Sequence, residues 1–200
     1  MTASTHDLLI GDHEVVKTFR SWDRDEPARE WNALTLLHTQ APGLAPEPIA
    51  RRENDGRPAV AMGRLPGVAL GGGALSRDQV AAVADAMTRL HTAVPRTGLA
   101  GLRPRVFAVG DAVRDLREAY TRAPVAANGG SVVNTALAEA RRWLATDEAG
   151  SLADPSGYEV FAQADGNLAN YLWDGECCRL VDFEDSGVSD RAFEVADLAE

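Results

Sequence analysis

The sequence predicts an α+β protein, and three observations support this fold class. Short apolar runs typical of strands come first, at residues 7–19 and 57–63. Apolar residues at helical spacing then dominate the middle of the chain. After Pro155, strand-like runs return around a turn at residues 174–175. Strands and a helix, followed mostly by helices and a late hairpin, indicate an α+β protein in two lobes.

The N-terminal part is expected to carry a hairpin and a helix. Residues 7–19 form two short apolar runs separated by a Gly-Asp turn, and Lys17 lies on the second run. Asp25 suits an N-cap, and the apolar spacing after it predicts a helix over about 26–39, with Glu30 near its start.

The boundary between the two lobes is expected after the strand at residues 57–63. That strand ends in a turn at Pro66, and a loose glycine-rich stretch follows. We therefore expect an N-terminal lobe over 1–66 and a C-terminal lobe over 67–200.

Three helices are expected at the start of the C-terminal lobe. Ser76 and Gln79 match a capping box, which predicts a helix that ends near residue 92. Two more stretches of helical spacing lie near 108–122 and 132–146.

Composition excludes some classes of protein. The 200 residues are 45% hydrophobic, enough for a sizeable core. A formal charge of -10 argues against a nucleic-acid partner, because phosphate backbones bind basic surfaces. The same charge mildly favours a cationic small molecule, although solubility is the simpler explanation. Without a secretory signal or an apolar run of about 18 residues, we expect no membrane association and a cytoplasmic location.

Lys17 is the only lysine, since the other nineteen basic residues are arginine. One interpretation is a lysine at a strand end with its ammonium in water. The other is that this position requires a compact point charge on a flexible stem, which the planar arginine fork does not provide.

The late hairpin brings polar groups together. If residues 174–175 form a two-residue turn, paired residue numbers sum to 349, and Asp182 falls opposite residue 167. Its carboxylate would then lie beside the loop that holds Asp165 and Asn170. Hard oxygen ligands of this kind suit Mg²⁺.

The stretches "QADGNLAN" and "LVDFED" resemble the catalytic loop and metal-binding segment of the aminoglycoside phosphotransferase and choline kinase family, which has a protein-kinase-like fold. The family loop reads H-x-D-x-x-x-x-N, and here it runs from Gln163 to Asn170. The resemblance implies that Asp165 is the catalytic base or positions the acceptor hydroxyl. It also implies that Asn170 and Asp182 bind Mg²⁺.

The same resemblance assigns residues to the nucleotide. It implies that Lys17 contacts the α and β phosphates of ATP and that Glu30 holds Lys17, with Glu26 as an alternative partner. The segment "AMGRLPG", which contains Met62 and Arg64, resembles the strand and hinge against which the adenine lies.

Some features depart from the family pattern or allow another interpretation. Gln163 stands where the family has histidine, and the chain is expected to be shortened at both ends. Asp165 and Asn170 could simply cap a turn. The carboxylates after residue 181 are expected to be mostly solvated, with Glu184 and Asp185 placed to face a cationic substrate.

The resemblance implies a function. We expect a phosphotransferase that uses ATP and Mg²⁺ to transfer the γ-phosphoryl group to a hydroxyl of a small molecule, such as an aminoglycoside or another cationic compound. A non-catalytic, pseudokinase-like nucleotide-binding member of the same family is the alternative. A metal-dependent hydrolase that uses the same carboxylates is a third interpretation, which the absence of histidine from the motif disfavours.

Overall fold

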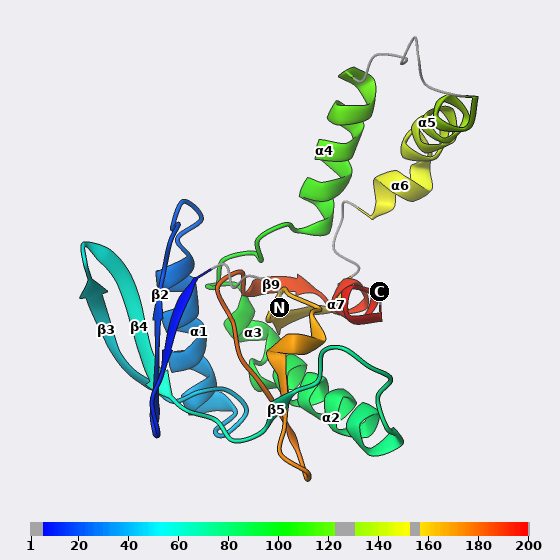
Figure 1. The fold of residues 1–200 in the computed structure, drawn as a ribbon. Helices are drawn as coiled ribbons and strands as arrows, with labels where there is room; N and C mark the ends of the chain where they lie inside the picture. Colours follow the sequence, from blue (N-terminus) through cyan, green and yellow to red (C-terminus); the bar gives the residue numbers. More distant parts are fainter. Residues whose placement is uncertain (1–5, 123–130, 153–156, 200) are drawn as a thin grey trace. The chain divides into compact units, whose positions relative to one another are not determined.

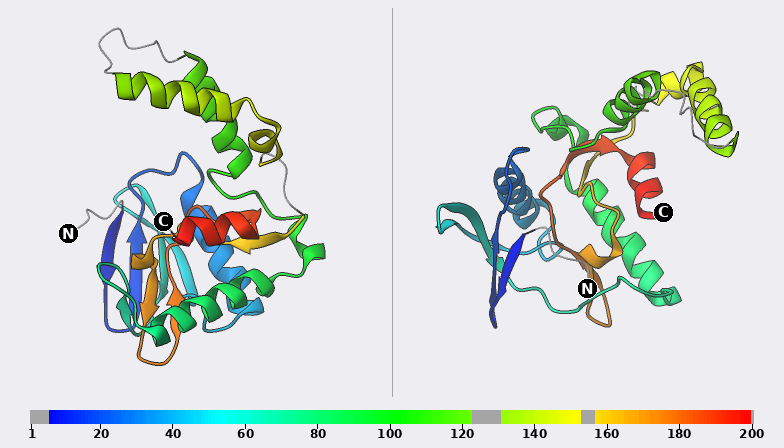
Figure 2. Two further views of the ribbon diagram at one scale, coloured as in Figure 1. Left: turned by 90° about the vertical axis from the view of Figure 1, so that its right-hand side faces the viewer. Right: turned by 45° about the horizontal axis from the view of Figure 1, so that its top comes forward.

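The computed structural model describes residues 6–122, 131–152 and 157–199 (Figures 1 and 2). The chain forms two compact units, one within Met1–Val106 and Glu159–Glu200, the other within Phe107–Tyr158. The lobe boundary expected at residue 66 falls inside the first unit and stays a prediction. Each unit is described by itself.

An antiparallel sheet opens the first unit, with strand order β1-β2-β4-β3. The hairpin predicted within residues 7–19 is confirmed, because β1 pairs with β2. The sequence did not indicate β3, whose side chains are mostly exposed at the edge of the sheet. The four strands are β1 (Asp7–Ile10), β2 (Glu14–Thr18), β3 (Pro48–Asn54) and β4 (Arg57–Gly63).

Helix α1 (Glu26–Gln40) lies along one face of this sheet (Figure 1). Its buried residues include Leu34 and Leu37, three positions apart, as the predicted apolar stripe requires. Asp25 occupies the N-cap position but makes no side-chain capping bond, so that part of the prediction is wrong. Its backbone has φ 64°, and its carboxylate forms an ion pair with Arg103 instead.

Helix α2 (Arg77–Ala93) begins with the predicted capping box, in which Ser76 and Gln79 bond each other's backbone. It packs against β6 and β8. The remaining elements of this unit are β5 (Val68–Ala69), α3 (Arg96–Leu99), β6 (Glu159–Ala162), the 3₁₀ turn η1 (Leu168–Asn170), β7 (Tyr171–Trp173), β8 (Cys178–Leu180), β9 (Gly187–Asp190) and α7 (Arg191–Ala199).

One apolar core joins the sheet, α1, α2 and the late hairpin. Phe183 is fully buried in it, which stabilises the fold by about 2 kcal/mol. Asp182 and Glu184 flank this anchor in the sequence, so burial of the aromatic ring places both carboxylates at the border of the core.

The register predicted for the β7–β8 hairpin is wrong by two residues. Tyr171 pairs with Leu180 and Trp173 with Cys178, so paired numbers sum to 351 and the loop has four residues. The wider loop forms because Asp174 Oδ1 accepts the backbone N–H groups of residues 176 and 177, each at 2.9 Å. Continued beyond the strands, this register sets position 182 opposite 169 instead of 167.

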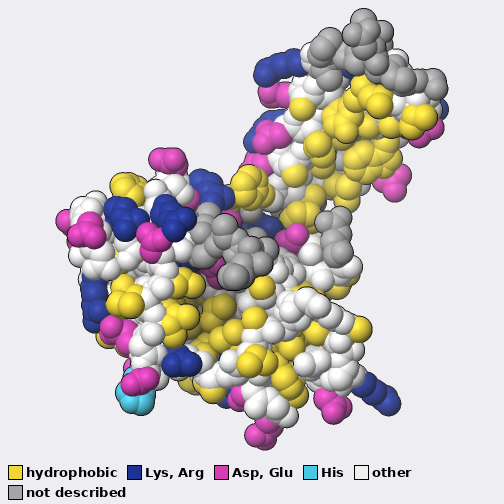
Figure 3. All heavy atoms as spheres, in the orientation of Figure 1, with side chains coloured by type: hydrophobic (Ala, Val, Ile, Leu, Met, Phe, Trp, Pro, Cys, Tyr) yellow, Lys and Arg dark blue, Asp and Glu magenta, His cyan; other side chains and the backbone are white. Residues whose placement is uncertain are grey.

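The second unit contains α4 (Val109–Arg122), α5 (Ser131–Leu144) and α6 (Asp147–Ser151). The helices predicted near 108–122 and 132–146 are confirmed. Two arginines join α4 to α5: Arg117 Nε donates to the Leu144 carbonyl at 2.9 Å, and Arg141 Nε donates to the Tyr120 carbonyl at 2.8 Å. Figure 3 shows hydrophobic side chains gathered on these helices.

Throughout the described parts of both units, no helix has the length and apolar character needed to cross a bilayer.

Candidate active site

Lys17 points into the protein from β2. It pairs directly with Val60 of β4, which is fully buried, and residues directly opposite each other share a face of the sheet. Lys17 is only 4% exposed, and its ammonium lies 5.0 Å from the centre of the Phe19 ring. The interpretation with the ammonium in water is therefore wrong.

Three carboxylates surround the ammonium of Lys17. Lys17 Nζ lies 3.1 Å from Glu30 Oε2 and 2.7 Å from Glu184 Oε2, and it also forms an ion pair with Asp182. One carboxylate oxygen from each acid lies within 4.8 Å of the others. The structure thus brings Lys17, Glu30 and Asp182 together, and their roles at a nucleotide stay predictions.

Glu30 is the most enclosed member of this cluster. It is 0% exposed, and its Oε2 also accepts the backbone N–H of Phe183 at 3.0 Å. Glu26, the alternative partner for Lys17, pairs with Arg24 instead, with Arg24 Nε 3.2 Å from Glu26 Oε1. The helix therefore presents Glu30 to the lysine.

Electrostatics keep Lys17 charged. Burial alone would lower the pKa of Lys17, but attraction to the three carboxylates raises it above its usual value. Burial raises the pKa of Glu30, and the attraction of Lys17 offsets only part of this effect. A single ammonium among three acids leaves an excess of negative charge, which favours an additional cation.

His6 is a member of the cluster that sequence reasoning missed. Its Nε2 lies 2.7 Å from Glu184 Oε2, while Nδ1 accepts the backbone N–H of Arg20 at 3.2 Å. Burial tends to raise the pKa of Glu184, but hydrogen bonds from His6 and Lys17 lower it to about 2. Glu184 therefore faces Lys17 and His6, and a contact of Glu184 with a substrate stays a prediction. No motif marks His6, because only the pairing of β1 with β2 brings it near.

The acidic stretch that follows β8 is not mostly solvated, so that expectation is also wrong. Asp185 Oδ1 lies 3.1 Å from Arg24 Nη1, and Glu194 is buried in an ion pair with Arg105. Burial raises the pKa of Asp185. Both arginines are distant in sequence, which is why composition could not identify these pairs.

The loop over residues 163–170 fixes the direction of Asp165. Its Oδ1 accepts the backbone N–H of Asn167 at 2.9 Å, and its Oδ2 accepts Nδ2 of Asn170 at 2.7 Å. Asn167 Oδ1 in turn accepts the N–H of Ala169 at 3.0 Å. The turn-capping bonds therefore exist, and they hold the carboxylate that the resemblance assigns as the base.

Gln163 ties this loop to the segment that carries Asp182. Its Nε2 donates to the carbonyl of Val181 and lies 3.4 Å from the carbonyl of Asp182. An amide thus links the two segments at the position where the family has histidine. Ala164 and Asp182 both have φ 69°, a strained left-handed conformation for residues other than glycine.

The donor set fits Mg²⁺ at Asn170 and Asp182. The side-chain nitrogen of Asn170 donates to Asp165, so the side-chain oxygen of Asn170 is left to bind a metal ion. Asp182 forms its ion pair with Lys17 through Oδ1. Val181 N–H donates to the Asn170 carbonyl at 3.0 Å, so the two candidate ligands lie on bonded stretches. Mg²⁺ usually takes one or two protein ligands of this type. The buried Glu30 Oε1 accepts no hydrogen bond from the described residues, which also suits an added cation nearby.

An apolar surface extends from Lys17 along the same face of the sheet. Val15 lies two residues before Lys17 and pairs with Met62 on one side and Ile10 on the other. Met62 is only 5% exposed and belongs to the core, and its contact with an adenine stays a prediction. Arg64 commits its side chain to the β1–β2 turn, where Nη1 donates to the Gly11 carbonyl at 3.0 Å, and its nucleotide role stays a prediction.

A model of the phosphotransferase enzyme family (APH) matches residues 8–200. The chain belongs to the phosphotransferase enzyme family. The predicted family resemblance is thereby confirmed over almost the entire length. No curated protein sequence gives a significant match to this phosphotransferase.

Solved structures show the same fold. Aminoglycoside phosphotransferase APH(3'')-Id from Streptomyces rimosus is 19% identical, with a TM-score of 0.64, over 99% of this chain and 76% of that one. A choline/ethanolamine kinase family protein from Mesorhizobium loti is 17% identical, with a TM-score of 0.60, over 98% and 61%. Spectinomycin phosphotransferase APH(9)-Ia, in complex with ADP and spectinomycin, is 14% identical, with a TM-score of 0.60, over 95% and 63%. The predicted protein-kinase-like α+β fold is confirmed.

Proposed function

We propose that this phosphotransferase transfers the γ-phosphoryl group of ATP to a hydroxyl of a small molecule. The observation that carries the proposal is the buried ammonium of Lys17, held by Glu30 and paired with Asp182. Three acids fix this ammonium in one place, and together they leave an excess of negative charge that favours an added cation. Phosphoryl transfer uses a fixed ammonium of this kind, because it depends mainly on positioning and on charge neutralisation.

On the donor side, Lys17 binds the α and β phosphates while Glu30 fixes its direction. The adenine lies against the apolar surface of Val15 and Met62. The phosphates of bound ATP compete with Asp182 for the ammonium of Lys17, because the phosphates and the carboxylate are both anions that bind this cation. Asp182 and Asn170 are the residues that would hold Mg²⁺. Bound Mg²⁺ would supply neutralisation of the phosphate charge.

On the acceptor side, Asp165 orients the hydroxyl and receives its proton. The acceptor oxygen forms a bond to the γ-phosphorus, and the bond from that phosphorus to the bridging oxygen of the β-phosphate breaks, releasing ADP. The two hydrogen bonds on Asp165 hold its carboxylate in one direction, which reduces the cost of orientation.

The acceptor is proposed to be cationic, as aminoglycosides are. The acidic balance of the chain supports this through steering. Similar proteins were solved with streptomycin, gentamicin and spectinomycin. A cytoplasmic location accompanies the proposal, because ATP is available there.

One observation favours a non-catalytic, pseudokinase-like alternative. Gln163 replaces the family histidine, and both oxygens of Asp165 already accept hydrogen bonds within the loop. In that case the chain binds nucleotide without transferring a phosphoryl group.

An acceptor screen separates the two functions. The chain is incubated with Mg·ATP and, in turn, streptomycin, gentamicin, spectinomycin, choline or ethanolamine, and products are examined by mass spectrometry. The proposal expects one acceptor to gain a phosphoryl group, and Asp165→Asn to reduce this roughly a hundredfold or more. Tight Mg·ATP binding with no phosphorylated product from any acceptor would support the alternative.

A further inference from the structure

Arg105 lies on an extended segment whose backbone is fixed in place. Its N–H donates to the Val188 carbonyl at 3.0 Å, and the Val188 N–H donates to the Arg103 carbonyl at 2.8 Å. The contact with β9 is so close that a Cβ on Gly187 would lie 2.5 Å from the Arg105 nitrogen. The direction of the Arg105 side chain is therefore set by the sheet.

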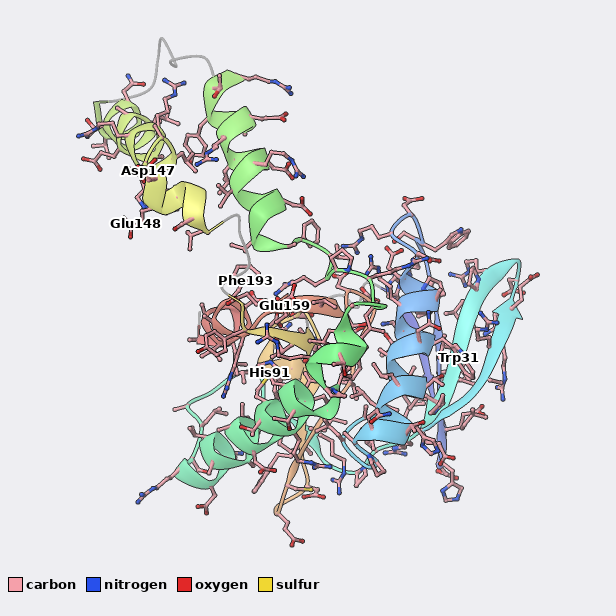
Figure 4. The ribbon with its side chains drawn as sticks, turned by 180° about the vertical axis from the view of Figure 1, so that it is seen from behind. Trp31, His91, Asp147, Glu148, Glu159 and Phe193 are labelled. Carbon is pink, nitrogen blue, oxygen red and sulfur yellow. The ribbon has the colours of Figure 1, made fainter. Side chains whose placement is uncertain are left out.

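The guanidinium of Arg105 joins α7 to the loop that carries Asp165. Its Nη2 donates to the Ala164 carbonyl at 3.0 Å and to Asp197 Oδ2 at 3.1 Å, and it forms a buried ion pair with Glu194. It also lies 4.7 Å from the ring of Phe193, which Figure 4 labels on α7. With 6% exposure, this arginine is buried and paired on several sides.

Both neighbours of Asp165 in the sequence are held by this arrangement. Ala164 has a left-handed backbone at φ 69°, and Arg105 bonds its carbonyl. Gly166 packs so tightly on the end of α7 that an added Cβ would lie 2.2 Å from the Asp197 carbonyl oxygen. A strained conformation persists only when its surroundings enforce it, and here the enforcing groups are Arg105 and α7.

We propose that Arg105 is a positioning residue for Asp165. By holding the Ala164 carbonyl, it fixes the strained peptide that aims the Asp165 carboxylate, without itself touching the reactants. The inference rests on the proposed function for its kinetic consequence, but its structural part can be tested alone. If instead Arg105 only stabilises the fold, its loss would affect the whole first unit evenly.

Hydrogen exchange at single amides tests the structural part. The Asn167 N–H reports directly on Asp165, because Asp165 Oδ1 accepts it, and the Leu180 N–H, bonded to the Leu44 carbonyl at 2.9 Å, reports on the core. In Arg105→Lys, which keeps the charge but loses the planar fork, we expect exchange at Asn167 to rise about tenfold more than at Leu180.

Arg29→Lys is the matched control. Arg29 donates to the carbonyls of Pro104 and Ser186, each at 2.9 Å, so it braces the same segment through the same chemistry. Among the described residues, the hydrogen bonds of Arg29 go to the carbonyls of Arg24, Pro104 and Ser186 and none goes to the loop over residues 163–170. We therefore expect the Asn167 and Leu180 amides to respond equally in this variant. An equal response in Arg105→Lys as well would overturn the proposal.

Kinetics test the consequence. With Mg·ATP alone, release of inorganic phosphate should show kcat lowered roughly ten- to a hundredfold in Arg105→Lys, with KM for Mg·ATP unchanged. A rise in KM with kcat unchanged would contradict positioning of Asp165. If wild type shows no turnover with water or any acceptor while the loop-specific exchange is present, the proposed function fails and the structural inference stands. Urea unfolding of each variant, with Arg105→Met as a second substitution, checks that all are folded.

Discussion

The ammonium of Lys17 and the carboxylate of Glu30 lie 3.1 Å apart, thirteen residues apart in the sequence, and join β2 to α1. Glu30 uses the same oxygen to accept the N–H of Phe183, so one carboxylate fixes both the lysine and the segment that carries Asp182. A compact ammonium can meet three acids at one point, whereas a planar guanidinium spreads its donors over a wide fork. This explains a lysine in a chain that otherwise uses arginine.

Lys17→Met should lower the free energy of unfolding by about 3 kcal/mol relative to wild type. The reason is that Glu30 and its neighbours would be left buried without a cation. Adding Glu30→Gln to Lys17→Met should recover part of this loss, since one uncompensated acid is removed. Urea denaturation of the two single variants and the double variant measures the coupling, and strictly additive losses would argue against a direct pair.

Glu30→Gln should weaken Mg·ATP binding by roughly tenfold, because an amide no longer holds the charged lysine by a charge-assisted bond. Glu26→Gln is the matched control, since Glu26 is equally buried on the same helix but pairs with Arg24. Titration of both variants with Mg·ATP, after their stabilities are compared, checks the assignment. Equal loss of affinity in the two would mean that α1 acts only as a support.

The sequence predicted local features well. The β1–β2 hairpin, α1 and the Ser76 capping box follow from apolar period and cap chemistry, which act over a few residues. The motif spacing also located Asp165 on its loop. The partner of Lys17 required the resemblance, because no local pattern distinguishes Glu30 from Glu26.

Long-range features were not predictable. The place of His6 beside Glu184 depends on strand pairing between the chain's start and its interior. The β7–β8 register depends on the side chain of Asp174, which accepts hydrogen bonds within a four-residue loop. An Asp-Gly pair in the sequence predicts a two-residue turn, so it does not indicate this longer loop. The buried ion pair between Arg105 and Glu194 joins residues 89 positions apart, beyond any sequence window.

Gly166→Ala should destabilise the protein by roughly 3 kcal/mol or more, because its Cβ would lie 2.2 Å from the backbone oxygen of Asp197. Gly101→Ala is the control, since nothing lies within 4 Å of its Cβ position and its φ is not left-handed. It should differ from wild type by less than about 1 kcal/mol. Thermal unfolding compares them, and a benign Gly166→Ala would mean that α7 does not pack against the loop.

Stability should fall as pH decreases from about 6.5 towards 4, in part because of His91. Burial, with a contribution from the nearby charge of Arg191, lowers the pKa of His91 to about 4. Between the ordinary pKa of histidine and this lowered value, the unfolded chain binds a proton that the folded chain does not. The free energy of unfolding should fall by about 2 kcal/mol through His91, after allowance for solvent screening.

His91→Gln should remove that part of the pH dependence. Figure 4 labels His91 near the end of α2. Urea unfolding of wild type and variant at several pH values between 7.5 and 5 gives the difference in slope. Parallel curves would show that His91 does not titrate differently in the folded and unfolded chains.

Thermal unfolding with and without Mg·ATP, for wild type and Asp182→Asn, tests the central claim most directly. A ligand at about 100 times its dissociation constant stabilises the folded state by ~2.7 kcal/mol. The account predicts this stabilisation for wild type and its loss in Asp182→Asn, because the variant lacks the carboxylate proposed to bind Mg²⁺. Cooperative unfolding of both proteins with no shift in either, or an equal shift in both, would contradict a magnesium-nucleotide site at Lys17 and Asp182.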